Sequence, residues 1–218
     1  MSSDPGSGSA ADQRGAGDFP GVMMALVTDN ADPKGLGRVK LTYPWMGTKE
    51  DTYWARIAAP MAGPDRGEFF LPEEGDEVLV AFENGDLEHP SVLGGLWNGQ
   101  REPPEDNADG NNDIRTIRSR SGHSLTFDDA ENGGSVTIET ASGQVIEMVD
   151  ESGSEKISIA DKNGQNTLTF DPNSGEVSLS SMGTVTIEAT NLKLEGTGGV
   201  SIESSGMLTL KGSLVKIN

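Results

Sequence analysis

The strongest constraint on the fold is a short repeat in the second half of the chain. From His123 onward, two apolar residues separated by one other residue recur between turns rich in Gly, Asn or Ser. Successive pairs lie ten or eleven residues apart at first, and 7–9 apart from Val177 to the end. Such self-similarity is typical of a β-solenoid or β-helix. The pairs are Leu125/Phe127, Val136/Ile138, Ile146/Met148, Ile157/Ile159, Leu168/Phe170, Val177/Leu179, Val185/Ile187, Leu192/Leu194, Val200/Ile202, Leu208/Leu210 and Val215/Ile217.

Each repeat offers too little apolar surface for one chain to bury, because it has one strand and one turn. A monomeric solenoid needs two or three strand faces in each coil. Three copies wound around one axis solve the problem, since each copy supplies one face of a triangular prism and pairs its edges with its neighbours. The repeat therefore predicts an intertwined trimeric β-helix over residues 114–218. The expected trimer core includes Val177, Leu179, Val185, Ile187, Leu192, Leu194, Val200, Ile202, Leu208 and Leu210.

The first half of the chain has a different character. Residues 19–98 hold all three Trp and both Tyr, so this segment is expected to have its own core. Turn signals such as "DNADPKG" and "ENGDLEHP" separate short apolar runs. Five short strands in this length fit a small Greek-key barrel of the OB kind. The expected strands span residues 22–28, 37–43, 53–58, 77–82 and 91–96.

The remaining segments lack apolar periodicity. Residues 1–18 are rich in Gly, Ser, Ala and Asp, which predicts a flexible tail. Residues 99–113 are polar and contain Pro, which predicts a linker too short to hold an inserted catalytic domain. The fold expected is therefore all-β, with an OB-fold five-stranded barrel over 19–98 followed by the β-helix.

Composition excludes several classes of protein. The net charge of −19 repels nucleic-acid phosphates, which argues against general nucleic-acid binding. The chain has no Cys, so it can form neither a disulfide framework nor a Cys-based zinc site. The longest apolar run is too short to span a bilayer, and no signal peptide is recognisable. We expect assembly in the cytoplasm.

Two stretches carry a family resemblance. In order along the chain stand "DP…GRVK…PW", then "YWARIAAPMAGPDRGEFFLPEEGDEVLVAFENGD" and "PSVLGGLWNG". This series resembles the OB domain of the phage baseplate assembly protein V and VgrG spike family. The C-terminal repeats, which end in "LTLKGSLVKIN", are similar to the tapering β-helix of the same spikes. The resemblance covers nearly the whole chain beyond Asp18.

The resemblance implies a structural role without catalytic residues, metal or cofactor. It implies the central spike of a contractile injection system. The sequence leaves open a phage tail, an extracellular injection particle or a type VI apparatus, and the short segment before residue 19 favours the first two. The spike would be a homotrimer that caps the tube, joins a baseplate hub protein at the OB end and pierces a target envelope. A PAAR-type protein would cap its C-terminal tip, and tube or effector proteins are further partners. Contact with the target membrane would be transient.

Three family features are missing from the sequence. Related long spikes carry a large hub domain before the OB barrel, whereas a short tail precedes residue 19 here, so we expect a separate hub protein to dock on the barrel. No lysozyme domain fits between barrel and helix. Some related tips bind iron through a His-x-His pair, whereas this chain has only His89 and His123. Two other functions stay open: a trimeric stalk that presents an OB ligand-binding module, and an envelope-degrading spike enzyme.

Interface candidates lie at both ends. Tyr43, Trp45, Tyr53 and Trp54 occupy positions where nucleic-acid-binding OB barrels place stacking rings, but an acidic chain lacks the basic groove that such stacking needs. We expect these rings to fill the core or to contact the hub. Between Gly122 and Leu210, 14 Asp and Glu residues outnumber three Lys, whereas the end of the chain has two Lys and no acid. That end is the expected tip interface: Leu214, Val215, Lys216, Ile217 and Asn218.

Other acidic groups have simpler interpretations. Asp29, Asn30 and Asp32 lack the spacing of an EF-hand and are expected to form a turn. The pairs Glu73/Glu74 and Asp128/Asp129 lie in turns without a nearby His or nucleophile, so they are expected to be solvated rather than catalytic.

Overall fold

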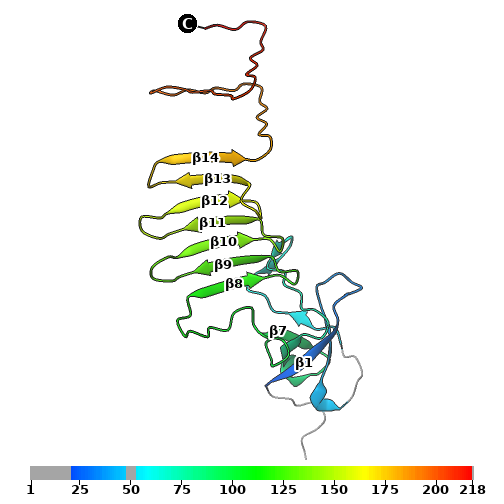
Figure 1. Cartoon of the computed structure of the whole chain (residues 1–218). Helices are drawn as coiled ribbons and strands as arrows, with labels where there is room; N and C mark the ends of the chain where they lie inside the picture. Colours follow the sequence, from blue (N-terminus) through cyan, green and yellow to red (C-terminus); the bar gives the residue numbers. More distant parts are fainter. Residues whose placement is uncertain (1–20, 48–52, 218) are drawn as a thin grey trace, which may run out of the picture. The chain divides into compact units, whose positions relative to one another are not determined.

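The computed structural model describes residues 21–47 and 53–217, and the regular secondary structure in these ranges is almost all β-strand (Figure 1). The predicted tail over 1–18 and the predicted tip residue Asn218 lie outside the described residues. Two one-turn 3₁₀ helices interrupt the strands, η1 (Pro44–Met46) and η2 (Glu83–Gly85). In the described ranges, no helix has the length and apolar character needed to cross a membrane. The structure divides into two units between Asp106 and Asn107.

The first unit is built on a five-stranded sheet of order β2-β1-β6-β7-β3. Strands β3 and β7 run parallel, and the other neighbouring pairs are antiparallel. Val39 and Ala55, which precede the two outer strands, exchange backbone hydrogen bonds of 3.1 and 2.8 Å. The sheet therefore curls until its outer strands meet, an arrangement compatible with an OB fold. The strands are β1 (Val22–Asp29), β2 (Lys40–Thr42), β3 (Arg56–Ile57), β6 (Glu77–Phe82) and β7 (Pro90–Leu96).

The core of this unit follows from strand alternation. Every second residue of β6 is buried, as are alternate residues of β1, because successive side chains of a strand point to opposite faces. A short hairpin, β4 (Ala62–Gly63) with β5 (Arg66–Gly67), lies between β3 and β6 in the sequence and was not predicted. The buried apolar residues are Ala25, Val27, Val39, Leu41, Tyr43, Ala55, Val78, Val80, Phe82 and Val92.

The second unit contains a seven-stranded antiparallel meander in which each strand pairs with its neighbours in the sequence (Figure 1). Successive strands begin ten or eleven residues apart, which is the spacing of the apolar pairs. The strands are β8 (Ile114–Arg118), β9 (Ser124–Asp128), β10 (Ser135–Glu139), β11 (Val145–Val149), β12 (Lys156–Ala160), β13 (Asn166–Asp171) and β14 (Glu176–Ser181).

This meander corrects one expectation. We predicted that neighbouring levels over 114–218 would pair between different chains, but over 114–181 the ladder forms within one chain. The reason is the length of the repeat. Four to six residues separate successive strands, which is enough to reverse the chain in a hairpin. Residues 182–217, where the repeat is shorter, form no strand in this structure.

Candidate functional site

The apolar pairs of the repeat lie on one face of the meander. Residues directly opposite each other in an antiparallel ladder share a face, and the register aligns each pair with the next. The result is two columns that together hold thirteen apolar side chains, called here the apolar face. One column holds Phe127, Val136, Met148, Ile157, Phe170 and Val177, and the other holds Ile117, Leu125, Ile138, Ile146, Ile159, Leu168 and Leu179.

The apolar face is uncovered in the single chain. Ile146, in the middle of its column, is 43% exposed, and its neighbour Ile159 is 45% exposed. A hollow of about 960 Å³ lies along the first column, with Phe127, Met148 and Phe170 among its lining residues. Apolar patches of this extent are rare on monomeric soluble proteins and mark interaction surfaces.

The opposite face of the same sheet is polar along its centre, with Val145, Val149 and Ala160 nearer its edges. Its central column holds hydroxyl residues on six of the seven strands, and the hydroxyls of Thr116 and Thr126 lie 3.0 Å apart. Because the thirteen residues of the two apolar columns all lie on one face, that face is the side of the sheet that most needs a partner. The polar column is Thr116, Thr126, Thr137, Glu147, Ser158, Thr169 and Ser178.

The apolar pairs beyond β14 are also exposed in the single chain. The large side chains of this segment are exposed, and Ile217 reaches 88%. The predicted core residues in this group are Val185, Ile187, Leu192, Leu194, Val200, Ile202, Leu208 and Leu210, and the predicted tip residues are Leu214, Val215, Lys216 and Ile217. One chain by itself therefore offers these residues no core.

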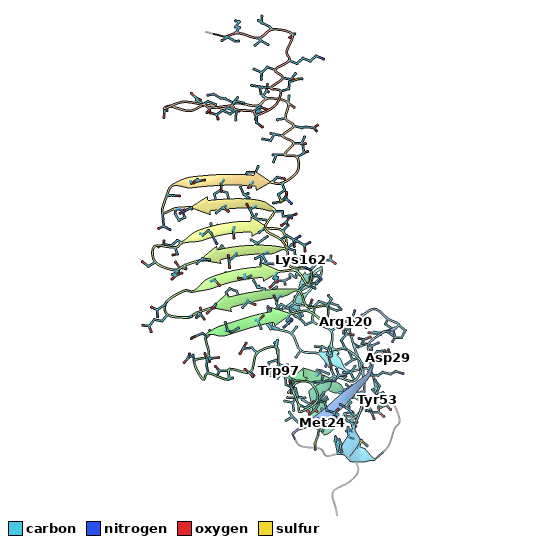
Figure 2. All side chains as sticks on the ribbon, viewed as in Figure 1. Met24, Asp29, Tyr53, Trp97, Arg120 and Lys162 are labelled. Atoms are coloured by element: carbon cyan, nitrogen blue, oxygen red, sulfur yellow. The ribbon has the colours of Figure 1, made fainter. Side chains whose placement is uncertain are left out.

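The four aromatic candidates of the first unit divide into two groups. Tyr43 is only 2% exposed and packs with its ring centre 5.6 Å from that of Phe82, so it fills the core and is not available as an interface residue. Trp45 and Tyr53 are exposed at the surface. The Tyr53 hydroxyl donates a 2.8 Å hydrogen bond to Glu88, which raises the pKa of Tyr53 (Figure 2 labels this residue).

Trp54 is half-buried beneath two cations. The Arg38 guanidinium carbon lies 5.7 Å and the Lys40 ammonium 5.4 Å from the centre of its ring, within the range of cation–π contact. Glu83 and Glu88 line the same shallow pocket of about 570 Å³. The pocket is therefore mixed in charge.

Asp32 organises the loop between β1 and β2. Its carboxylate accepts bonds from the backbone N–H groups of Lys34 and Leu36, at 3.0 and 3.1 Å. Both oxygens also accept bonds of 2.8 Å from the Arg38 guanidinium. The Arg38 pair is the main cause that holds the pKa of Asp32 well below its usual range. With its oxygens used in this way, Asp32 serves the turn, as its sequence context indicated.

The paired carboxylates of the second unit also serve turns. Asp128 accepts a 3.0 Å bond from the backbone N–H of Ala130, and Asp129 forms an ion pair with Arg115. Within the described ranges, no three His, Asp or Glu residues are grouped closely enough to hold a metal ion.

Sequence reasoning missed a second apolar surface, on the first unit. Phe69 is 75% exposed and lines a groove of about 380 Å³ together with Leu36 and Phe70. Gly37 has φ +66° and leaves room for the Phe69 ring, because a Cβ at this position would lie only 3.2 Å from the ring. Two adjacent Phe residues after a Gly turn were the available signal, since such a pair seldom buries both rings on one side of a strand.

Comparison with known proteins matches the first unit. Residues 23–97 match the family described as the type VI secretion system/phage-baseplate injector OB domain. The chain is 38% identical over 72 residues to the type VI secretion system spike protein VgrG2a of Pseudomonas aeruginosa. It is 35% identical to the actin cross-linking toxin VgrG1 and 33% to the spike protein VgrG3, both of Vibrio cholerae, over the same length.

These matches are confined to one domain. Each covers 31% of this chain and between 7% and 9% of the relative, so the chain spans a small part of the length of these proteins. The matched residues include the five strands of the curled sheet, apart from the first residue of β1, and the whole of its core. The expected family resemblance is thereby confirmed for this segment. Residues 23–97 therefore form an injector OB domain of the kind found in phage-baseplate and VgrG spike proteins.

Proposed function

We propose that this chain is the structural central spike of a contractile injection particle, and that it works as a homotrimer. The observation that carries the proposal is the uncovered apolar face of the meander, together with the exposed apolar pairs that continue to the end of the chain. Apolar surface of this extent is stabilised only when another apolar surface covers it.

Three copies suit this surface because it is narrow. Each strand contributes only two side chains to the apolar face, so three sheets arranged around one axis enclose a slender triangular prism. The columns then run along the axis. Two sheets packed face to face would also cover the columns, as in a β-sandwich, and the mass of the assembly distinguishes the two cases.

The shorter repeat beyond Ser181 supports intertwining near the tip. A strand of five residues in a repeat of 7–9 leaves only two to four residues for a corner. Such a corner favours a turn onto the next face of the prism over a return to the same sheet. We therefore propose that residues 182–218 form the triple-stranded β-helix with two other copies, in which their exposed apolar pairs become the core.

The role proposed is mechanical and non-enzymatic. In the intact particle, the OB domain would join the baseplate hub, for which Trp45, Tyr53 and Trp54 are the proposed contacts. A PAAR-type cap would bind the C-terminal tip, and contraction would drive the needle through the target envelope. Two of the matched relatives are named as spike proteins. The toxin activity in the name of the third belongs to a protein of which this chain matches 7%.

A binding experiment at the tip tests the proposal. Full-length chain and a chain that ends at Ser213 are each mixed with a tagged PAAR-type protein from the same source. We expect capture of the full-length chain and loss of capture on truncation, because Leu214, Val215 and Ile217 offer exposed apolar surface. Lys211→Ala, which leaves these three residues in place, is the control. Equal capture of the truncated chain would contradict a tip interface.

A further inference from the structure

The two edges of the meander differ in charge. Turns alternate between the edges because the strands alternate in direction, so β9–β10, β11–β12 and β13–β14 turn at one edge, called here the acidic edge. Turns β8–β9, β10–β11 and β12–β13 lie at the other, called the cationic edge. The acidic edge carries Asp113, Asp128, Asp129, Glu131, Asp150, Glu151, Glu155, Asp171 and Glu176, and the cationic edge carries Arg118, Arg120 and Lys162.

Ion pairs at the acidic edge do not remove its excess of carboxylates. The acidic edge has two cations, of which Arg115 pairs with Asp129 and Lys156 lies 3.7 Å from Glu147 on the polar face. Nine carboxylates thus face two cations at this edge. The lowered pKa values of Glu155 and Asp171, caused chiefly by hydrogen bonds in their turns, favour the charged forms of both carboxylates.

The cationic edge carries few carboxylates, Glu139 and Asp161. The Asp161 carboxylate is engaged by its own turn, where it accepts bonds of 3.2 and 2.8 Å from the backbone N–H groups of Asn163 and Gln165. Lys162, the next residue, is exposed. Figure 2 shows the labelled residues Arg120 and Lys162 at this same edge of the sheet.

Rotational symmetry brings unlike edges together. When identical sheets stand around an axis that runs along their columns, rotation places one edge of each sheet beside the opposite edge of the next, which is a heterologous contact. We propose that the acidic edge of each copy docks against the cationic edge of its neighbour, at the three corners of the prism. This inference rests on the proposed trimer and names the surfaces that hold its corners.

The turns of the two edges also alternate in height. A rotation does not move a residue along the axis, so each copy presents its turns at the same levels. The β12–β13 turn with Lys162 lies midway between the β11–β12 and β13–β14 turns of the neighbouring acidic edge. Strands are spaced by about 4.8 Å, so Lys162 meets carboxylates about one strand above and one strand below. The turns of one edge therefore fit between the oppositely charged turns of the next edge, and this fixes the register of the copies along the axis.

Charge reversal tests the pairing. One variant combines Arg118→Glu with Lys162→Glu. A second combines Glu131→Lys with Glu151→Lys, whose turns lie next in height to those of Arg118 and Lys162, and a third carries all four changes. The residues chosen are exposed. Lys34→Glu with Arg66→Glu, in the first unit, changes the net charge as much as the first variant and serves as the control. Sedimentation velocity of the full chain in fixed urea gives the trimer dissociation constant, and circular dichroism monitors the fold.

We expect each single-edge reversal to weaken the trimer by at least about tenfold at low salt, because every contact is repeated at three corners. The variant with all four changes should have a trimer dissociation constant within about threefold of the wild-type value. About 1 M salt should reduce the differences in dissociation constant between all the variants. Reversals no more harmful than the control, or no recovery in the combined variant, would overturn the edge pairing while the trimer stands. A wild-type chain that does not form trimers would overturn the proposed function as well.

Discussion

The apolar face is best tested by removing one side chain from the centre of its columns. Ile146 lies on β11, opposite Ile138 on one side and Ile159 on the other. Val145, the preceding residue, is also β-branched but points to the polar face, where it stands opposite Glu139 and Ala160. Ile146→Ala and Val145→Ala therefore change the same strand by a similar volume on opposite faces.

The expected effect follows from the exposure of Ile146. Complete burial of an isoleucine side chain stabilises by about 1.5–3 kcal/mol. The side chain is 43% exposed in the single chain, so association would contribute about 0.6–1.3 kcal/mol per copy. Three copies give about 2–4 kcal/mol for each trimer. At 1.4 kcal/mol for each factor of ten, this is a roughly 30- to 700-fold change in the trimer dissociation constant.

Sedimentation equilibrium over a dilution series in fixed urea provides the assay. We expect the Ile146→Ala trimer to dissociate at a much higher protein concentration than the wild type, and the Val145→Ala trimer to stay close to it. Circular dichroism of both variants checks that the sheet itself is retained. If both variants shift the dissociation constant equally, the side chain at 146 is not in the trimer interface, and the reasoning from the apolar face fails.

Two further predictions concern the OB domain. Because the Asp32 pKa is lowered in the folded state, mainly by its pair with Arg38, this carboxylate stabilises the fold above its unfolded pKa and loses that effect as the pH falls below about 4. Urea unfolding of residues 19–106 between pH 2 and 7 should therefore show a flatter acid dependence in Asp32→Asn than in wild type, and an unchanged slope would contradict this role. Tyr43→Ala should destabilise the domain by about 3–5 kcal/mol because the ring is in the core, whereas the exposed Tyr53→Ala should cost less than about 1 kcal/mol; similar losses would contradict the placement of Tyr43.

The sequence predicted the strands of the curled sheet well where alternation was strong. Strand β6 has the expected bounds, and β1 and β7 differ from expectation by one residue at an end. The hairpin of β4 and β5 was missed because its strands have two residues each and include Gly, which leaves no apolar alternation to detect. Periodicity therefore located the strands that form the core and not those outside it.

Pairing partners were harder to predict than strands. The apolar pairs identified the residues that share one face on every strand from β9 to β14, yet they could not show whether the next strand belongs to the same chain. Turn length decided that question over 114–181, where four to six residues suffice to reverse the chain. The burial of Tyr43 and the exposure of Phe69 depend on how the sheet curls, which a local pattern of apolar residues does not specify.

In the proposed trimer, three copies of this chain cover one another's apolar faces. Sedimentation equilibrium of the full-length protein in dilute buffer measures the mass of the assembly without reference to its shape. We expect a single species with three times the chain mass of 22.9 kDa, which persists at the lowest measurable concentrations. A stable, folded species of 22.9 kDa would contradict the proposed trimer, and a dimer would replace the prism with a two-sheet sandwich.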